Sequence, residues 1–174
     1  MGLISRIFRR RPVTTKYQVT EAYSSLREMV LTTSPEKLGI GGGGIWGVVM
    51  ESGYEKAVAT LVAIADGTVS LYLSNGGGFI GMGTQEGPSQ AARALLQAAP
   101  NFTQFCHPTT TFALPEPART RFFILRGREV LTAEAETDEL GKNRESLSPF
   151  FHAAHELISQ IRLTDSKLNK EANP

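Results

Sequence analysis

The sequence predicts a single α+β domain: a mainly antiparallel sheet of five or six strands with helices packed on it. Three observations lead to this prediction. Asp66-Gly67 separates two apolar runs, as is typical of a tight hairpin turn. Apolar residues recur at helical spacing in other segments of the chain. The 174 residues, 41% of them hydrophobic, are enough for one core without disulfides.

The first expected element of the domain is a helix at 20–32. Apolar residues between Val19 and Val30 repeat at helical spacing, and Thr20 is a suitable N-cap for it. Ser34-Pro35 interrupts the pattern, because the residue before a proline disfavours helical geometry.

Residues 45–74 predict a three-stranded antiparallel meander. The first run is rich in β-branched and aromatic residues, the second is almost wholly apolar, and the third alternates between apolar and polar residues. The fold prediction depends on this meander, because parallel strands would need a long crossover between them. The three strands are expected at 45–51, 57–64 and 68–73.

The second half of the domain is expected to contain two helices and a second hairpin. Small apolar residues stripe a helix at 88–99, which Pro100 ends. Residues 100–120 should form a loop with a short extended piece at 109–112. The remaining expected elements are a hairpin at 121–125 and 129–133, a solvated acidic stretch at 134–139, and a helix from Ser148-Pro149 to about Leu163.

The resulting order of elements is α-β-β-β-α-β-β-α. By this order alone the chain resembles the profilin-like and roadblock-type folds, which are small regulatory modules with a central antiparallel sheet. The resemblance implies an architecture and carries no site residues, because no motif accompanies it. The expected boundaries are a basic amphipathic arm at 1–12, the domain at 13–165 and a polar, frayed tail at 166–174.

Positive charge is concentrated at the N-terminus. The formal net charge is +1, but residues 1–11 hold four arginines and no acid, which leaves 14 Lys and Arg against 17 Asp and Glu elsewhere. We expect this arm to contact an anionic membrane surface or a partner protein, to dock on the domain itself, or to have no specific role. The residues expected to make such a contact are Leu3, Ile4, Arg6, Ile7, Phe8, Arg9, Arg10 and Arg11.

Glycine is concentrated in the middle of the chain, where 14 of the 17 glycines lie between Gly39 and Gly87. Loops 41–47 and 75–83 both match G-x-G-x-x-G, but neither has the strand, helix and acidic residue that a dinucleotide site requires. Either the glycines are structural, or both loops meet at one sheet end and bind an anion or small ligand. The ligand-binding residues in that case are Gly42, Gly44, Trp46, Asn75, Gly76, Gly77 and Gly78.

The histidines and the cysteine give weaker indications of a functional site than the basic arm and the glycine-rich loops do. His152 and His155 could offer two metal ligands from one helix, but no third ligand has diagnostic spacing, so we expect no metal and no cofactor. Cys106 and His107 are neighbours whose side chains point apart in an extended chain, so Cys106 is expected to be a structural thiol. A single cysteine excludes a disulfide framework, and the small net charge excludes a globally basic nucleic-acid binder.

The expected function is therefore that of a small cytoplasmic, non-enzymatic interaction or regulatory module. It would be attached through its arm to a partner protein or to the inner face of a membrane, and a homo-oligomer is compatible with the sequence. The alternative is a domain, enzymatic or not, that binds a small ligand or anion at loops 41–47 and 75–83. No apolar run approaches the length that spans a bilayer.

Overall fold

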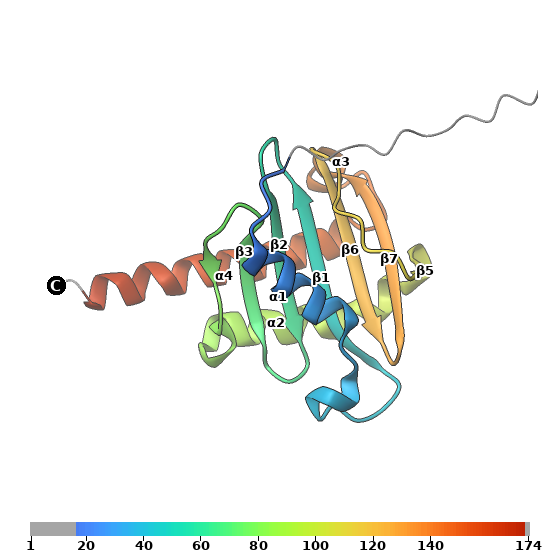
Figure 1. The fold of residues 1–174 in the computed structure, drawn as a ribbon, viewed down its shortest axis with the longest axis horizontal. Helices are drawn as coiled ribbons and strands as arrows, with labels where there is room; N and C mark the ends of the chain where they lie inside the picture. Colours follow the sequence, from blue (N-terminus) through green and yellow to red (C-terminus); the bar gives the residue numbers. More distant parts are fainter. Residues whose placement is uncertain (1–16, 173–174) are drawn as a thin grey trace, which may run out of the picture.

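The structure, a computed structural model that describes residues 17–172, has a seven-stranded antiparallel sheet with helices on both faces (Figure 1). The strand order is β4-β3-β2-β1-β6-β7-β5. The predicted α+β class and single domain are confirmed, with seven strands in place of five or six. The predicted arm at 1–12 and the last two residues of the chain lie outside the described residues.

Each helix and strand that the sequence predicts is present, and the ends agree to within a few residues except at the end of the last helix. The strands are β1 (Ile45–Gly53), β2 (Val58–Ile64), β3 (Val69–Leu73), β4 (Gly78–Phe79), β5 (His107–Thr109), β6 (Arg119–Arg126) and β7 (Glu129–Glu136). The helices are α1 (Glu21–Thr32), α2 (Glu86–Ala98), α3 (Thr137–Gly141) and α4 (Ser148–Ala172), and three short 3-10 helices are η1 (Pro35–Leu38), η2 (Met82–Thr84) and η3 (Ala99–Phe105).

The predicted meander of β1, β2 and β3 is confirmed, with both strand pairs antiparallel. Its second turn follows the expected chemistry. Gly67 has a φ of 94°, and the Asp66 carboxylate accepts a 2.8 Å hydrogen bond from the Thr68 amide. At the start of α1, the Thr20 hydroxyl accepts a hydrogen bond from the Tyr23 amide, which confirms the predicted N-cap.

Helices α2 and α4 cover one face of the sheet. The larger apolar cluster lies between them and the strands, and its aromatic centre is formed by phenylalanines from three elements. The Phe150 ring of α4 lies 4.8 Å from the Phe102 ring and 5.3 Å from the Phe122 ring, measured between centroids. Phe122 and Phe150 are both fully buried, so this face of the sheet is closed to solvent.

The opposite face, which we call the α1 face, is covered more thinly. Helix α1 crosses it in front of the strands (Figure 1), and the segment at 110–117 passes over its β6 side. A smaller apolar cluster lies beneath them. It includes Trp46 and Phe123, and Phe112 packs edge to face on Phe123 with 5.8 Å between the rings.

The two additional strands are short edge strands in segments that the sequence predicts as loops. Strand β4 has two residues and pairs with β3, and β5 has three residues and pairs with β7. The extended piece expected at 109–112 therefore lies earlier, at His107–Thr109. Such short strands exist because a neighbouring strand pairs with them, and two or three residues carry no periodic signal.

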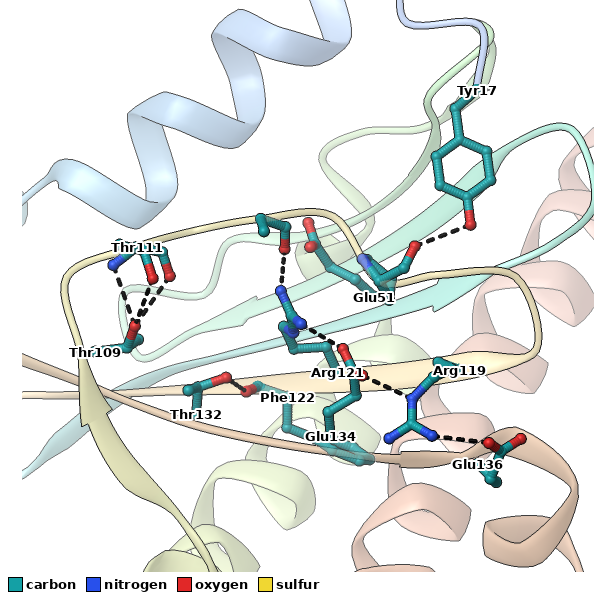
Figure 2. A network of polar contacts seen from close by, with 12 residues as sticks. Tyr17, Glu51, Thr109, Thr111, Arg119, Arg121, Phe122, Thr132, Glu134 and Glu136 are labelled. Carbon is teal, nitrogen blue, oxygen red and sulfur yellow. Dashed lines mark hydrogen bonds and ion pairs between the residues drawn. The ribbon is translucent and has the colours of Figure 1, made fainter. Parts of the chain in front are cut away.

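The last helix and the acidic stretch also differ from the prediction. Helix α4 continues to Ala172, through residues that we expected to fray, because no glycine or proline interrupts it there and polar pairs such as Asn169 with Asp165 support it. The acidic stretch lies in β7 and α3 and not in a loop, but much of it is solvated as expected, since the Glu136 and Asp138 side chains are 55% and 87% exposed. Glu134 and Glu136 lie in β7 and form ion pairs with Arg119 at 2.7 and 2.8 Å (Figure 2).

Candidate functional site

Helix α1 is fastened to the sheet by a buried ion pair. The Arg27 guanidinium donates hydrogen bonds of 2.6 and 2.9 Å to the two carboxylate oxygens of Glu51, which is fully buried in β1. Thr60 of β2 joins the same network. Its hydroxyl donates to Glu51 at 3.3 Å and shares a 2.9 Å hydrogen bond with the Tyr23 hydroxyl. Because both charges are matched and enclosed, this network holds the helix in place.

The phenols beside this network are kept neutral by their surroundings. Burial raises the pKa of Tyr23, and the Glu51 carboxylate raises it further. The pKa of Tyr72 on β3 is raised by the same two causes in the same order. The Tyr23 and Tyr72 rings pack edge to face with 5.6 Å between their centroids. Neither phenol is therefore a candidate general base. Both rings serve as packing surface, and the Tyr23 hydroxyl is held by Thr60.

Two adjoining hollows lie on the side of α1 that faces β2 and β3, and together we call them the α1–β3 trough. Their volumes are about 260 and 240 Å³, and Leu26 and Tyr72 line both. Three of the exposed large apolar side chains of the described chain border this trough: Met29, Leu73 and Ile80. Exposed apolar groups gathered around a hollow are typical of a binding surface. The larger of the two hollows is also lined by the apolar residues Val30, Leu38, Val62 and Ile64 and by the polar or charged residues Thr33, Lys37, Asp66, Thr68 and Ser70.

A larger hollow of about 560 Å³, the Trp46 pocket, lies on the other side of α1. The Trp46 indole lines it and donates a 2.9 Å hydrogen bond to the Gly127 carbonyl oxygen. Several threonines and two charged side chains contribute to the wall of this pocket. They are Thr32, Thr33, Thr109, Thr110, Arg128 and Glu129.

The two glycine-rich loops do not meet. The run Gly41–Gly44 precedes the start of β1, near Ile64, whereas the run Gly76–Gly78 follows the end of β3, near Ala59. The rest of the 75–83 loop returns along β3 to the Gly67 turn. The two glycine runs thus lie at opposite ends of the sheet, so the expectation of one shared anion-binding concavity is wrong. The reason lies in the meander itself, since the first and third strands of a meander run in the same direction.

The predicted ligand-binding residues are distributed over separate places. Trp46 lines the Trp46 pocket, and Gly76, Gly77 and Gly78 line the end of the α1–β3 trough near Thr20. Gly42, Gly44 and Asn75 line neither hollow. Binding of a ligand by any of the seven residues stays a prediction.

Substitution of Gly78 should be far more costly than substitution of Gly41. Gly78 has a φ of 141°, and a Cβ there would collide with the Leu71 carbonyl oxygen, whereas a Cβ on Gly41 would meet nothing within 4 Å. We expect Gly78→Ala to lower the free energy of unfolding by about 1–3 kcal/mol and Gly41→Ala to change it by less than about 0.5 kcal/mol. Urea denaturation of the two variants checks this, and equal midpoints would contradict it.

The histidines of α4 belong to a packed surface. His155 lies on Phe151 with 4.2 Å between the ring centroids. Burial lowers the pKa of His155, and His152 and Arg162 lower it further, so the ring is neutral at pH 7. Within residues 17–172, no group of three or more His, Cys, Asp or Glu side chains could hold a metal ion, including at His152 and His155.

Cys106 should react slowly with alkylating agents. The thiol is half-buried, its Sγ lies 3.5 Å from the Phe102 carbonyl oxygen, and burial raises its pKa to about 11. Because only the thiolate attacks, we expect iodoacetamide at pH 8 to react roughly 100-fold more slowly with the folded chain than with the unfolded chain. The rate should rise about tenfold per pH unit below the pKa. Equal rates for the folded and unfolded chains would contradict this.

The sequence did not indicate that Arg27 and Glu51 form a pair. A helical arginine is ordinary, and its partner lies 24 residues further along the chain. The available signal was Glu51 itself, which is the lone acidic residue in a strand of apolar and small residues. A buried acid of this kind requires a cationic partner, but the sequence does not show which residue supplies it.

Comparison with protein-family models, with curated proteins and with solved structures found no significant match to this chain. Function therefore has to be inferred from the surface itself. Every helix within residues 17–172 is too short or too polar to span a bilayer. On the α1 face, the described side chains offer apolar surface beside the paired charges of Arg27 and Glu51 and beside Lys37 and Asp66.

Proposed function

We propose that this chain is a non-enzymatic interaction module whose binding surface is the α1 face of the sheet. In this proposal the α1–β3 trough receives the apolar side chains of a partner protein. One observation carries the proposal: two helices close the opposite face of the sheet, whereas α1 alone leaves an apolar hollow bordered by exposed side chains. Met29 of α1 borders the trough, and its side chain, at 62% exposure, is the exposed large apolar side chain of this helix.

The trough fits an amphipathic helix better than a polar ligand. It runs beside α1, whose 12 residues span about 18 Å. A partner helix that packs beside α1 would place apolar residues in the trough at intervals of three and four residues. Arg27 and Glu51, near the centre of the α1 face, are already paired with each other, whereas Lys37 and Asp66 line the trough itself. Specificity would therefore come from apolar shape together with these two charges.

A peptide-display selection on the immobilised full chain tests this proposal. We expect the enriched peptides to carry apolar residues at helical spacing, and Met29→Glu to weaken their binding by about tenfold or more, because it places a charge beside the trough. The matched control is Leu163→Glu, which changes a similarly exposed leucine (56%) on α4.

Two results would overturn the proposal. One is a selection in which no sequence class is enriched. The other is a set of peptides that bind equally well to the Met29→Glu chain and to the unchanged chain, or whose binding depends on Leu163 instead.

The Trp46 pocket supports a second candidate function, the binding of a small ligand. Its volume of about 560 Å³ lies in the range of small-molecule sites, and hydroxyl groups surround its aromatic wall. Trp46 is the sole tryptophan of the chain, so its fluorescence reports directly on this pocket. Saturable changes with nucleotides or anionic metabolites, weakened by Arg128→Ala, would favour this function, and flat titrations would contradict it.

The main proposal also includes a cytoplasmic location and attachment to a membrane or partner through residues 1–11. These residues lie outside the described part of the chain. The arginines supply the electrostatic attraction to anionic lipid. We expect the full chain to sediment with phosphatidylserine-containing vesicles, and to lose this binding when Arg6, Arg9, Arg10 and Arg11 are all replaced by glutamine. Equal sedimentation of the two chains would contradict membrane attachment.

A further inference from the structure

We infer that the apolar residues of the N-terminal arm bind in the α1–β3 trough of their own chain, and that a partner helix has to displace them. This inference rests on the proposed function, because it requires the trough to be a binding surface. It names the segment that occupies the trough when no partner is bound. The arm residues concerned are Leu3, Ile4, Ile7 and Phe8.

The described chain begins three residues before Thr20, which lines the trough. The Tyr17 hydroxyl donates a 2.9 Å hydrogen bond to the Pro115 carbonyl oxygen, and the Thr20 amide donates a 2.8 Å hydrogen bond to the Ser74 carbonyl oxygen. Tyr17 contacts the 110–117 segment on the β6 side of α1, so in this proposal the arm turns back past Thr20 to reach the trough.

The connecting chain is long enough for the arm to reach any part of the trough. Eight residues separate Phe8 from Tyr17, and an extended chain of this length spans about 30 Å. The trough runs beside α1, whose length is about 18 Å. Phe8 can therefore reach the far end of α1.

The arm and the trough also match in chemical character. The apolar residues of the arm are spaced to fall on one side of a helix, and so short a segment is only marginally helical on its own. The trough offers the apolar surface that would stabilise it, including Leu26, Val62 and Ile64. Docking would therefore bury the apolar side of the arm and the apolar residues of the trough against each other.

Net charge adds a weaker attraction. The four arginines of residues 1–11 face a remainder in which 17 acidic residues exceed 14 basic ones. A tethered segment has an effective concentration in the millimolar range, so even weak intrinsic affinity suffices for docking.

Disulfide trapping in the full chain tests this inference. With Cys106 replaced by serine, Ile7→Cys is combined either with Met29→Cys or with Glu28→Cys, and both chains are exposed to oxidised glutathione. Glu28 is the matched control, because it is the exposed neighbour of Met29 but lines a separate hollow on the other side of α1, between this helix and Leu114. We expect the Met29 pair to form an intrachain disulfide about tenfold faster or more.

A third chain, which adds Phe8→Asp to the Met29 pair, separates docking from random encounter. Docking predicts that this charge slows the disulfide by about tenfold, because it opposes burial of the arm. Equal rates at Met29 and Glu28, unaffected by Phe8→Asp, would overturn the inference. So would a disulfide that forms between chains at a rate proportional to protein concentration, since a second copy would then supply the occupant.

The failure of this inference can be distinguished from the failure of the proposed function. If the cross-linking rates are equal but selected peptides still depend on Met29, the trough is a binding surface and the arm does not occupy it. If the cross-link forms as expected and no peptide binds, the trough serves the arm alone.

Discussion

Replacing Glu51 with glutamine should lower the free energy of unfolding by about 3–5 kcal/mol. Glu51 is fully buried, and its carboxylate accepts two hydrogen bonds from Arg27, whose side chain is itself only 13% exposed. Arginine cannot lose its proton in a protein, so the variant would leave an unpaired positive charge under α1. Guanidinium denaturation of the full chain measures the effect as a lower midpoint with an unchanged slope.

Two further chains show whether the burial of the pair is responsible. Glu36 and Arg128 form an ion pair of 3.3 Å whose side chains are both exposed. We therefore expect no measurable change in the denaturation midpoint from Glu36→Gln. Replacing both buried partners, as Arg27→Met with Glu51→Leu, should restore most of the stability, because no charge then remains unpaired. A Glu51→Gln midpoint equal to that of Glu36→Gln would show that Glu51 does not fasten α1.

Replacing Phe150 with alanine should lower the free energy of unfolding by about 3–5 kcal/mol. Its ring is fully buried and packs on Phe102 and Phe122, so truncation leaves a cavity at the centre of the closed face of the sheet. Leu163→Ala on the same helix is the matched control, because its exposed side chain should contribute less than about 0.5 kcal/mol. Similar denaturation midpoints for the two variants would show that Phe150 is not a core residue.

The parts of the fold that the sequence predicts correctly are those with local signals. Asp66-Gly67 defines its turn through the backbone freedom of Gly67, and Thr20 caps its helix through its own hydroxyl. In both cases the residues that carry the signal also make the stabilising contact. The α+β class follows from these local elements, because a hairpin meander and amphipathic helices have few ways to bury their apolar faces.

The parts that the sequence does not predict depend on contacts between distant residues. Strands β4 and β5 exist because β3 and β7 pair with them, and Arg27 meets Glu51 because the helix crosses the first strand. The end of α4 near Ala172 was missed for a different reason: the apolar stripe stops where the helix leaves the core, but the backbone remains helical.

The candidate site was predicted in part. Trp46 and Gly76 do line hollows, but on different sides of α1, and the joint site at one end of the sheet is contradicted by the meander that the sequence itself predicts. The α1–β3 trough could not be predicted, because it depends on how α1 lies across β2 and β3. No residue pattern specifies that angle.

The central claim is that the α1 face, and not the face covered by α2 and α4, binds partners. Amide chemical-shift mapping of the ¹⁵N-labelled full chain with a display-selected peptide tests this claim most directly. The largest changes should fall at 26–30 on α1 and at 62–72 on β2 and β3, on both sides of the trough. Changes concentrated along α2 and α4, with the amides of α1 unmoved, would contradict it.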